Sequence, residues 1–339
     1  MARGRSKISH VDSEVVDEIL NKLDERCGKE APMVTTRGNI HDYLGMTLDC
    51  NINGKVQITM FEYIAKIIEE FRMELDGEPT SPAINHLFEV DDNGVKLKPE
   101  QKDLFHEFVA KLLFLGKQSR PDLKTAISFL STRVREPDTD NYKKIISLMK
   151  YLKGTKDIPL TLEADNSGCI KWWVDASFPV HPDMKSHSGT MMSMVQRAEI
   201  SGSKKQKVNT KSSTESELVG VDDYMPMIIW VKYFLEAHGY IVSNNLLHQD
   251  NQSSVKLEQN GKANSVKRTR HIAIRYYLVT VRIAGGDLRV DSCTTEKMLA
   301  DFCTKPLQEK LFRMLRSMIM NIQKTDSKDI SNIQLHMTQ

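Results

Sequence analysis

The sequence has few of the features that are typical of membrane-spanning, secreted or zinc-binding proteins. None of its 339 residues belongs to an apolar run of 18 or more, so we expect no transmembrane helix. The five cysteines are odd in number and lack C-x-x-C spacing, which argues against a disulfide framework or structural zinc. The N-terminal M-A-R-G-R-S-K has no apolar core of a signal peptide. We therefore expect an intracellular protein with no membrane partner.

The charge balance excludes a wholly basic, histone-like binder. The chain has 47 Lys and Arg residues against 45 Asp and Glu residues, a net charge of +2. This total leaves room for local basic patches. With 40% apolar and 27% charged residues, the composition is that of a globular protein long enough for two domains.

Apolar spacing and turn residues predict a mixed α/β chain in three parts. The first part has a helix at 11–27, strands at 42–49 and 55–60 that Asn53-Gly54 joins, and a helix at 61–71. The second part has helices at 100–116, 120–134 and 139–153. In the third part, the predicted strands are 160–163, 170–176, 189–195, 198–202, 245–250 and 287–291. Its predicted helices are 214–238, 252–260, 268–283, 296–303 and 308–322.

Four acids stand in places where a carboxylate is unexpected. Asp175 ends the apolar run K-W-W-V-D, and Asp250 ends the apolar run L-L-H-Q-D. Glu217 lies at a predicted helix start, and Asp301 lies in a late predicted helix. Four carboxylates that converge repel one another unless cations neutralise them, and oxygen-only ligands favour Mg²⁺ or Mn²⁺ over zinc. Two such ions about 4 Å apart would form a site for in-line displacement at phosphorus.

Each acid also has a purely structural interpretation. Asp250 fits the N-cap of the helix that follows it, and Asp301 fits a solvated helix residue. Glu215 and Glu217 each fit a capping box with the hydroxyl residue three positions earlier. Residues two apart on a helix point to nearly opposite sides, so only one of these glutamates can face the site. We assign Glu217, because Glu215 is the natural capping partner of Ser212, and keep Glu215 as the alternative.

A series of motifs resembles the ribonuclease H domain of copia-type retrotransposon polyproteins. The series is W-V-D-A-S, K-S-H-S-G, S-K-K-Q, S-S-T-E-S-E-L, Q-D-N-Q-S, K-R-T-R-H-I-A-I-R-Y and A-D-F-C-T-K-P-L, in family order between residues 158 and about 316. Upstream, H-D-Y-L-G-M-T-L, S-R-P-D-L-K-T-A-I-S-F-L and M-K-Y-L-K-G-T resemble the end of the same family's reverse transcriptase. The chain thus resembles a Pol polyprotein fragment, with the C-terminal part of the reverse transcriptase and a complete ribonuclease H domain.

This resemblance implies an α/β fold and a domain order. We expect a ribonuclease H-like mixed sheet with flanking helices, preceded by a truncated α+β polymerase palm remnant and a helical thumb or connection. The expected ranges are 1–95 for the palm remnant, 96–157 for the helical part, 158–322 for the ribonuclease H-like domain and 323–339 for a disordered tail.

The resemblance also implies an activity, namely endonucleolytic hydrolysis of the RNA strand of RNA–DNA hybrids. By analogy, Asp175, Glu217, Asp250 and Asp301 are the catalytic residues and bind two Mg²⁺ ions, with Mn²⁺ as a possible substitute. No small-molecule cofactor is implied. The implied partners are the hybrid and other parts of the retrotransposon polyprotein, and the implied location is the cytoplasm, in a virus-like particle, or the nucleus.

Two departures from the family pattern qualify this interpretation. No Y-x-D-D or F-x-D-D occurs in the chain, so we expect no polymerase activity from it alone. Met298 stands where the family usually has Gln, which puts the shape of the loop before Asp301 in question. The alternative to an enzyme is a catalytically inert element remnant with at most nucleic-acid binding.

Basic residues beside the acidic motifs are candidates for holding phosphates. The candidates are Lys204, Lys205, Lys207 and Lys211 on one side, and Lys267, Arg268, Arg270 and His271 on the other. The three tryptophans, Trp172, Trp173 and Trp230, are predicted to lie in the core and not to stack on bases.

Overall fold

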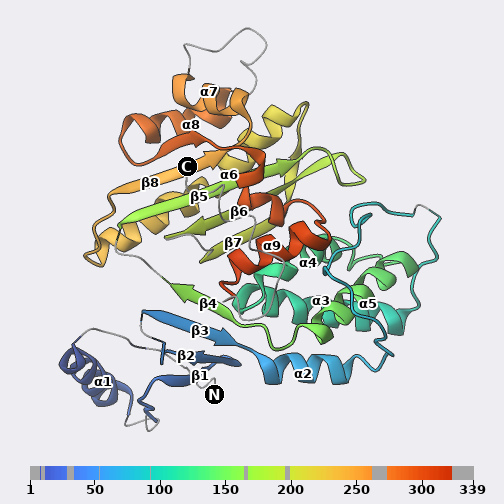
Figure 1. The fold of residues 1–339 in the computed structure, drawn as a ribbon, viewed down its shortest axis with the longest axis horizontal. Helices are drawn as coiled ribbons and strands as arrows, with labels where there is room; N and C mark the ends of the chain where they lie inside the picture. The colour runs from blue at the N-terminus through green and yellow to red at the C-terminus, as the bar shows by residue number, and fades with distance from the viewer. Residues whose placement is uncertain are drawn as a thin grey trace.

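The computed structural model describes residues 8, 12–28, 34–52, 54–91, 93–163, 167–194, 199–261 and 273–322. In this part of the chain, two β-sheets lie on either side of a group of helices (Figure 1). The predicted mixed α/β class is confirmed. Within the described residues, no helix combines the length and apolar character needed to cross a membrane. The tail predicted at 323–339 lies outside the described residues.

The first sheet is antiparallel, with the strand order β1-β2-β3-β4. Its strands are β1 (Ile40–Tyr43), β2 (Met46–Asp49), β3 (Lys55–Thr59) and β4 (Leu160–Glu163). Helix α1 (Ser13–Cys27) precedes the sheet, and α2 (Phe61–Glu70) follows β3. The prediction of one strand at 42–49 is wrong, because Leu44 and Gly45 have φ angles of 51° and 78° and turn the chain into a hairpin.

Strand β4 belongs to this first sheet, although it follows the predicted domain boundary at residue 158. Leu160 pairs with Ile58 of β3, and Glu163 pairs with Lys55. The Lys55 Nζ atom also lies 3.3 Å from Glu163 Oε2. The predicted domain ranges stay a prediction, but strand pairing extends the first sheet as far as Glu163.

The helical group between the sheets contains the three helices that the sequence predicts. These are α3 (Pro99–Gln118), α4 (Lys124–Ser131), which the 3₁₀ turn η1 (Pro121–Leu123) precedes, and α5 (Thr139–Gly154). Asp138 and Asn141 form a capping box at the start of α5. Phe105, Leu112 and Leu148 are fully buried where the helices meet, in a cluster that extends into both sheets.

The second sheet is mixed and has the strand order β7-β6-β5-β8-β9. Its strands are β5 (Cys169–Ser177), β6 (Lys185–Ser193), β7 (Ile200–Asn209), β8 (Asn244–Gln249) and β9 (Arg289–Ser292). Strand β6 is antiparallel to both β5 and β7, whereas β8 runs parallel to both β5 and β9. This arrangement is the expected ribonuclease H-like mixed sheet.

Three helices flank the second sheet in the described residues. They are α6 (Ser213–Ala237), α7 (Gln252–Asn260) and α8 (Ala273–Ala284). Helix α6 continues through Pro226 without a break. Pro226 lacks one N–H donor, but Met225 and Ile228 on either side are buried and keep the helix packed on the sheet.

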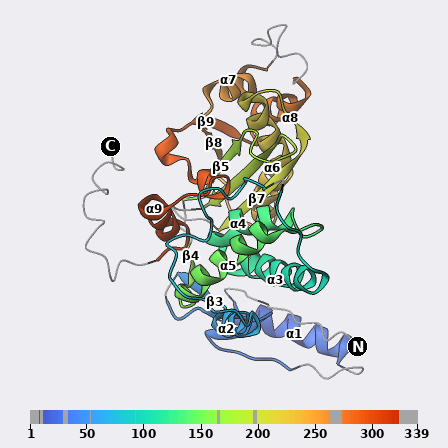
Figure 2. The ribbon, with the colours of Figure 1, turned by 90° about the vertical axis from the view of Figure 1, so that its right-hand side faces the viewer.

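The C-terminal segment links the second sheet to the helical group. The predicted helix at 296–303 is wrong, because Met298 has a non-helical ψ of 87° and separates the short 3₁₀ helices η4 (Thr295–Lys297) and η5 (Leu299–Cys303). Helix α9 (Glu309–Ile319) then lies beside the helical group (Figure 2). Phe312 of α9 stacks on Phe302 at a ring distance of 5.1 Å and meets Tyr151 of α5 at 5.8 Å. The C-terminal segment thus packs against both the second sheet and the helical group.

Candidate metal centre

Asp175 lies near the carboxyl end of β5, the middle strand of the second sheet. Because β5 has a partner strand on each edge and is covered on both faces, Trp172 and Val174 are fully buried and the strand is an apolar run. The Asp175 side chain follows them, and the residue is only 3% exposed. The strand therefore holds a carboxylate in a nearly dry place at the end of the sheet.

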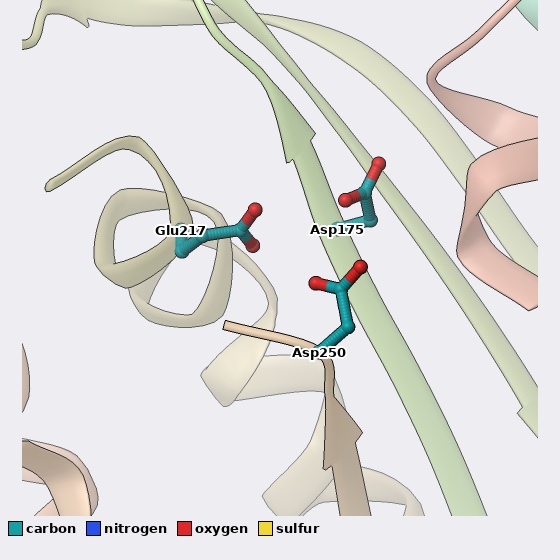
Figure 3. A group of neighbouring side chains, drawn as sticks. All are labelled: Asp175, Glu217 and Asp250. Atoms are coloured by element: carbon teal, nitrogen blue, oxygen red, sulfur yellow. The ribbon is translucent and has the colours of Figure 1, made fainter. Parts of the chain in front are cut away.

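Glu217 comes from the start of α6, where helix capping separates it from its neighbour Glu215. The Glu215 backbone N–H donates to Ser212 Oγ at 3.2 Å, so Ser212 caps the helix. Glu215 Oε2 in turn accepts a hydrogen bond from the Lys211 backbone N–H at 2.8 Å. Glu217 instead points toward Asp175 and Asp250 (Figure 3). Of the two glutamates, only Glu217 joins the acids of the sheet.

Asp250 follows β8 directly, and β8 runs parallel to β5. Because neighbouring parallel strands end at the same edge of a sheet, Asp250 and Asp175 come together there. The N-cap of α7 is Asn251, whose Oδ1 accepts from the backbone N–H groups of Ser253 at 3.1 Å and Ser254 at 3.2 Å. The capping interpretation of Asp250 is therefore wrong, and its carboxylate is available to the cluster.

Asp175, Glu217 and Asp250 form one carboxylate cluster. One oxygen atom from each residue lies within 4.8 Å of the corresponding oxygens of the other two. Figure 3 shows the three side chains converging from a strand, a helix and a strand end. Glu217 is 5% exposed, and its buried Oε2 atom has no hydrogen-bond partner. A buried carboxylate oxygen without a partner, aimed at two other acids, could bind a cation.

Asp301 stands beside this cluster and is not one of its three members. It lies in η5, and its Oδ1 atom accepts a hydrogen bond from Lys305 Nζ at 2.7 Å. Lys305 Nζ also lies 4.0 Å from Asp175 Oδ2, so the two acids are neighbours, and burial and the charge of Asp175 raise the pKa of Asp301 to about 6. The structure thus brings three of the four predicted acids together and places the fourth within reach of their charges.

The electrostatics of the cluster are those of acids whose charges are only partly compensated. Burial raises the pKa of Glu217 well above its usual range, and the charges of Asp175 and Asp250 raise it further. Burial also raises the pKa of Asp175, although Lys305 and the Thr304 hydroxyl act in the opposite direction. A divalent cation among these oxygens would offset the repulsion that both shifts reflect.

The donor set fits a hard divalent cation. All three cluster ligands are carboxylates, which suit Mg²⁺ or Mn²⁺, and the described residues add no histidine or cysteine to the group. The unpartnered Glu217 Oε2 gives a second reason for the fit, because coordination would satisfy it. The identity and number of the ions are taken up below as a proposal.

The lysines of the predicted basic patch on β7 do not all lie on the same face of the sheet. Lys204 and Lys205 are neighbours on β7, so their side chains point to opposite faces of the sheet. Lys204 Nζ lies 3.4 Å from Asp223 of α6, whereas Lys205 Nζ lies 2.8 Å from Asp183. Lys207 is exposed. The sequence neighbours thus serve different surfaces.

Several predicted nucleic-acid contacts cannot be placed. Lys267, Arg268, Arg270 and His271 lie outside the described residues. Of the tryptophans, Trp172 and Trp173 are in the core as predicted, with exposures of 0% and 8%. The prediction for Trp230 is wrong, because it is 58% exposed and stacks on Phe234 of the same helix.

The sequence interpretation missed two residues that contact the acids. The Thr304 hydroxyl donates to Asp175 Oδ2, and Lys305 Nζ lies 4.0 Å from the same oxygen atom. Both belong to the motif A-D-F-C-T-K-P-L. The spacing of four residues between Asp301 and Lys305 could have indicated their pairing.

Among solved structures, the chain is similar to the RNase H1 of Halobacterium salinarum, with 12% identity and a TM-score of 0.27, over 39% of this chain and 90% of the other. It is also similar to a foamy viral protease-reverse transcriptase in complex with an RNA/DNA hybrid, with 12% identity and a TM-score of 0.44, over 95% of this chain and 36% of the other. No protein-family model matches the chain.

Among curated proteins, a Pol polyprotein from transposon TNT 1-94 of Nicotiana tabacum is 24% identical over 78% of this chain. A Pol polyprotein from transposon RE2 of Arabidopsis thaliana is 30% identical over 65%. A putative transposon Ty5-1 protein of Saccharomyces cerevisiae is 27% identical over 54% of this chain and 59% of its own length. The chain spans only 20% and 15% of the first two. The chain is thus similar in sequence to retrotransposon Pol polyproteins.

Proposed function

We propose that this chain hydrolyses the RNA strand of RNA–DNA hybrids with the help of two divalent metal ions, Mg²⁺ or Mn²⁺. The observation that supports this most is the convergence of Asp175, Glu217 and Asp250 at one end of a ribonuclease H-like sheet. The homology with retrotransposon Pol polyproteins favours a nucleic-acid substrate over other phosphate esters.

The chain's own residues would hold and orient the reacting groups. Asp175, Glu217 and Asp250 would bind the ions, and we assign Asp301 as the fourth ligand, from the side of the cluster where it now lies. When bound, the two ions supply the charge that stabilises the attacking and leaving oxygens of an in-line displacement at phosphorus. The Thr304 hydroxyl fixes the orientation of Asp175, which is the kind of outer contact that keeps a ligand in place.

Substrate recognition is proposed to depend on backbone shape and charge. The ribose 2′-hydroxyl distinguishes an RNA strand from DNA, and lysines neutralise phosphates without reading bases. Lys204, Lys205 and Lys207 on β7 are the described candidates, and Lys267, Arg268, Arg270 and His271 complete the proposed set. One solved neighbour, the foamy viral enzyme, is bound to an RNA/DNA hybrid, which favours the same substrate class here.

We propose that the chain alone does not polymerise nucleotides, because no Y-x-D-D occurs in its sequence. A primer-extension assay checks this point. The proposed setting is inside the cell, in the cytoplasm or nucleus, with other parts of a Pol polyprotein as partners. Imaging of a tagged chain checks the location, and co-purification with Pol segments checks the partners.

Cleavage of a hybrid with a labelled RNA strand tests the proposed activity. We expect Asp175→Asn to lower the rate by more than about a hundredfold, because loss of even an outer-shell contact at a metal site typically costs 10–100-fold. Asp103→Asn is the matched control, since Asp103 is exposed on α3, and it should cleave like the unchanged chain. Equal rates for the two variants would refute the assignment, and no cleavage by the folded chain would favour an inert remnant.

A further inference from the structure

Lys305 is the cation that lies against the acidic residues of the site. Its Nζ atom is 2.7 Å from Asp301 Oδ1 and 4.0 Å from Asp175 Oδ2. Among the ion pairs of the described residues, no other lysine or arginine pairs with Asp175, Glu217, Asp250 or Asp301. A lysine side chain carries an ammonium charge at neutral pH, and here that charge lies against two carboxylates.

The backbone fixes where this ammonium lies. The Lys305 backbone N–H donates to the Asp301 carbonyl at 2.9 Å, which places the two side chains on the same side of the turn. The residue before it, Thr304, is fully buried and donates through its hydroxyl to Asp175. Lys305 itself keeps 39% of its side chain exposed. The backbone of Lys305 is thus held in place, while its partly exposed ammonium group can move away from the carboxylates.

We infer that Lys305 is a positioning residue that acts as the chain's own counter-ion to the carboxylate cluster, and that a divalent cation must bind against its charge. The inference deepens the proposed function and rests on it, because it presupposes that the cluster binds divalent ions. In this arrangement Lys305 holds Asp301 beside the cluster until an ion enters. Lys305 therefore sets how tightly the site holds metal.

The charges at the site predict the direction in which metal affinity changes when Lys305 is replaced. The same oxygen atoms that face Lys305 would face the metal ion, so the two cations repel each other across the site. Removal of the ammonium leaves one more uncompensated negative charge and frees Asp301 as a ligand. Because opposite charges about 4 Å apart near a protein surface interact strongly, we expect the Kd for Mn²⁺ to fall on the order of tenfold.

Titration calorimetry with Mn²⁺ on the intact chain tests this inference without any activity readout. Lys305→Gln should bind Mn²⁺ on the order of tenfold more tightly than the unchanged chain. Lys305→Arg keeps the charge and should bind with an affinity close to that of the unchanged chain. Lys297→Gln is the matched control, because Lys297 is an exposed lysine of η4 for which the structure shows no ion pair, and it should also leave the Kd unchanged. Unchanged or weaker binding by Lys305→Gln overturns the inference.

A second pair of variants keeps the test decisive if Lys305→Gln does not fold. Asp301→Asn lowers the negative charge, and the double variant Asp301→Asn with Lys305→Gln restores the balance of the site. The double variant should bind Mn²⁺ more tightly than Asp301→Asn alone, and equal affinities contradict the inference. If Mn²⁺ binds the unchanged chain and Asp250→Asn equally or not at all, the proposed metal site itself fails. That result would refute the metal site, whereas equal affinities of Asp301→Asn and the double variant would refute only the role of Lys305.

Discussion

At the scale of single residues, Gly189 of β6 allows the C-terminal segment to reach the acids. Gly189 pairs with Asp175 across the sheet. A Cβ atom at this position would lie 2.6 Å from Thr304 Cγ2 and 2.7 Å from Cys303 Cβ. Both distances are shorter than the approach of a Cβ atom to non-bonded atoms in folded proteins. The missing side chain therefore lets η5 lie on β6 and brings Thr304 to Asp175.

We expect Gly189→Ala to destabilise the fold by about 1–3 kcal/mol, because an added methyl group must displace the buried η5. Hybrid cleavage should fall with it, since Thr304 then orients Asp175 less well. Gly154→Ala is the control, because a Cβ there has no neighbour closer than 3.7 Å. Denaturant unfolding and cleavage of the two variants check this, and a Gly189→Ala chain as stable as the control would contradict the packing argument.

The sequence predicted the acidic residues of the site better than the residues that contact them. Asp175 and Asp250 were chosen because each ends an apolar run, and Glu217 because Glu215 is the natural capping partner of Ser212. An N-cap role for Asp250 was the alternative, and the structure gives that role to its neighbour Asn251. Thr304 and Lys305 contact the acids through a tertiary approach of η5 to β6, which periodicity does not encode.

At the scale of elements, a buried histidine pair joins the helical group to the second sheet. His181 Nε2 and His187 Nδ1 are 3.0 Å apart, and His187 Nε2 is 2.8 Å from Ser203 Oγ. The rings of Phe88 and Phe129 contact the pair from the helical side. Burial lowers the pKa of His181 to about 4 and that of His187 to about 3, so both rings are neutral near neutrality.

This pair predicts a loss of stability in mild acid. The folded-state pKa of His181 lies below the unfolded value of about 6.5, so the unfolded chain binds more protons as the pH falls through that window. The stability is complete above about pH 6.5, and between there and pH 4.5 His181 alone should cost roughly 2–3 kcal/mol.

Denaturant unfolding at several pH values measures this dependence. His181→Gln should lose less stability on acidification than the unchanged chain, even if it starts lower. His106→Gln, at an exposed position on α3, should keep the full pH dependence. If both variants show the same slope with pH, the histidine pair is not the origin of the acid sensitivity.

Element types were predicted well where apolar periodicity is long, and poorly where the backbone changes direction within a short run. Helices α3, α5 and α6 follow their spacing closely. The strand predicted at 42–49 became a hairpin because Leu44 adopts a positive φ, which a leucine rarely does. The helix predicted at 296–303 split at Met298, the residue that departs from the family pattern.

At the scale of the whole molecule, one buried apolar cluster extends through both sheets and the helical group, while the other face of the second sheet packs with α6 in a second cluster. Met46 of the first sheet, Leu112 of the helical group, Trp173 of the second sheet and Phe312 of α9 belong to the same buried cluster. The predicted domain ranges stay a prediction, and the sequence could not show that β4 and α9 connect the parts. The consequence is that the elements that carry the acids belong to a common frame.

We propose that this frame supports a metal-dependent nuclease specific for RNA in hybrids. Incubation of the folded chain with an RNA–DNA hybrid that carries a different label on each strand, with Mg²⁺ and with chelator, tests this proposal. We expect cleavage of the RNA strand only, in the presence of Mg²⁺ only. An intact RNA strand in the presence of Mg²⁺, or equal cleavage of both strands, would contradict it.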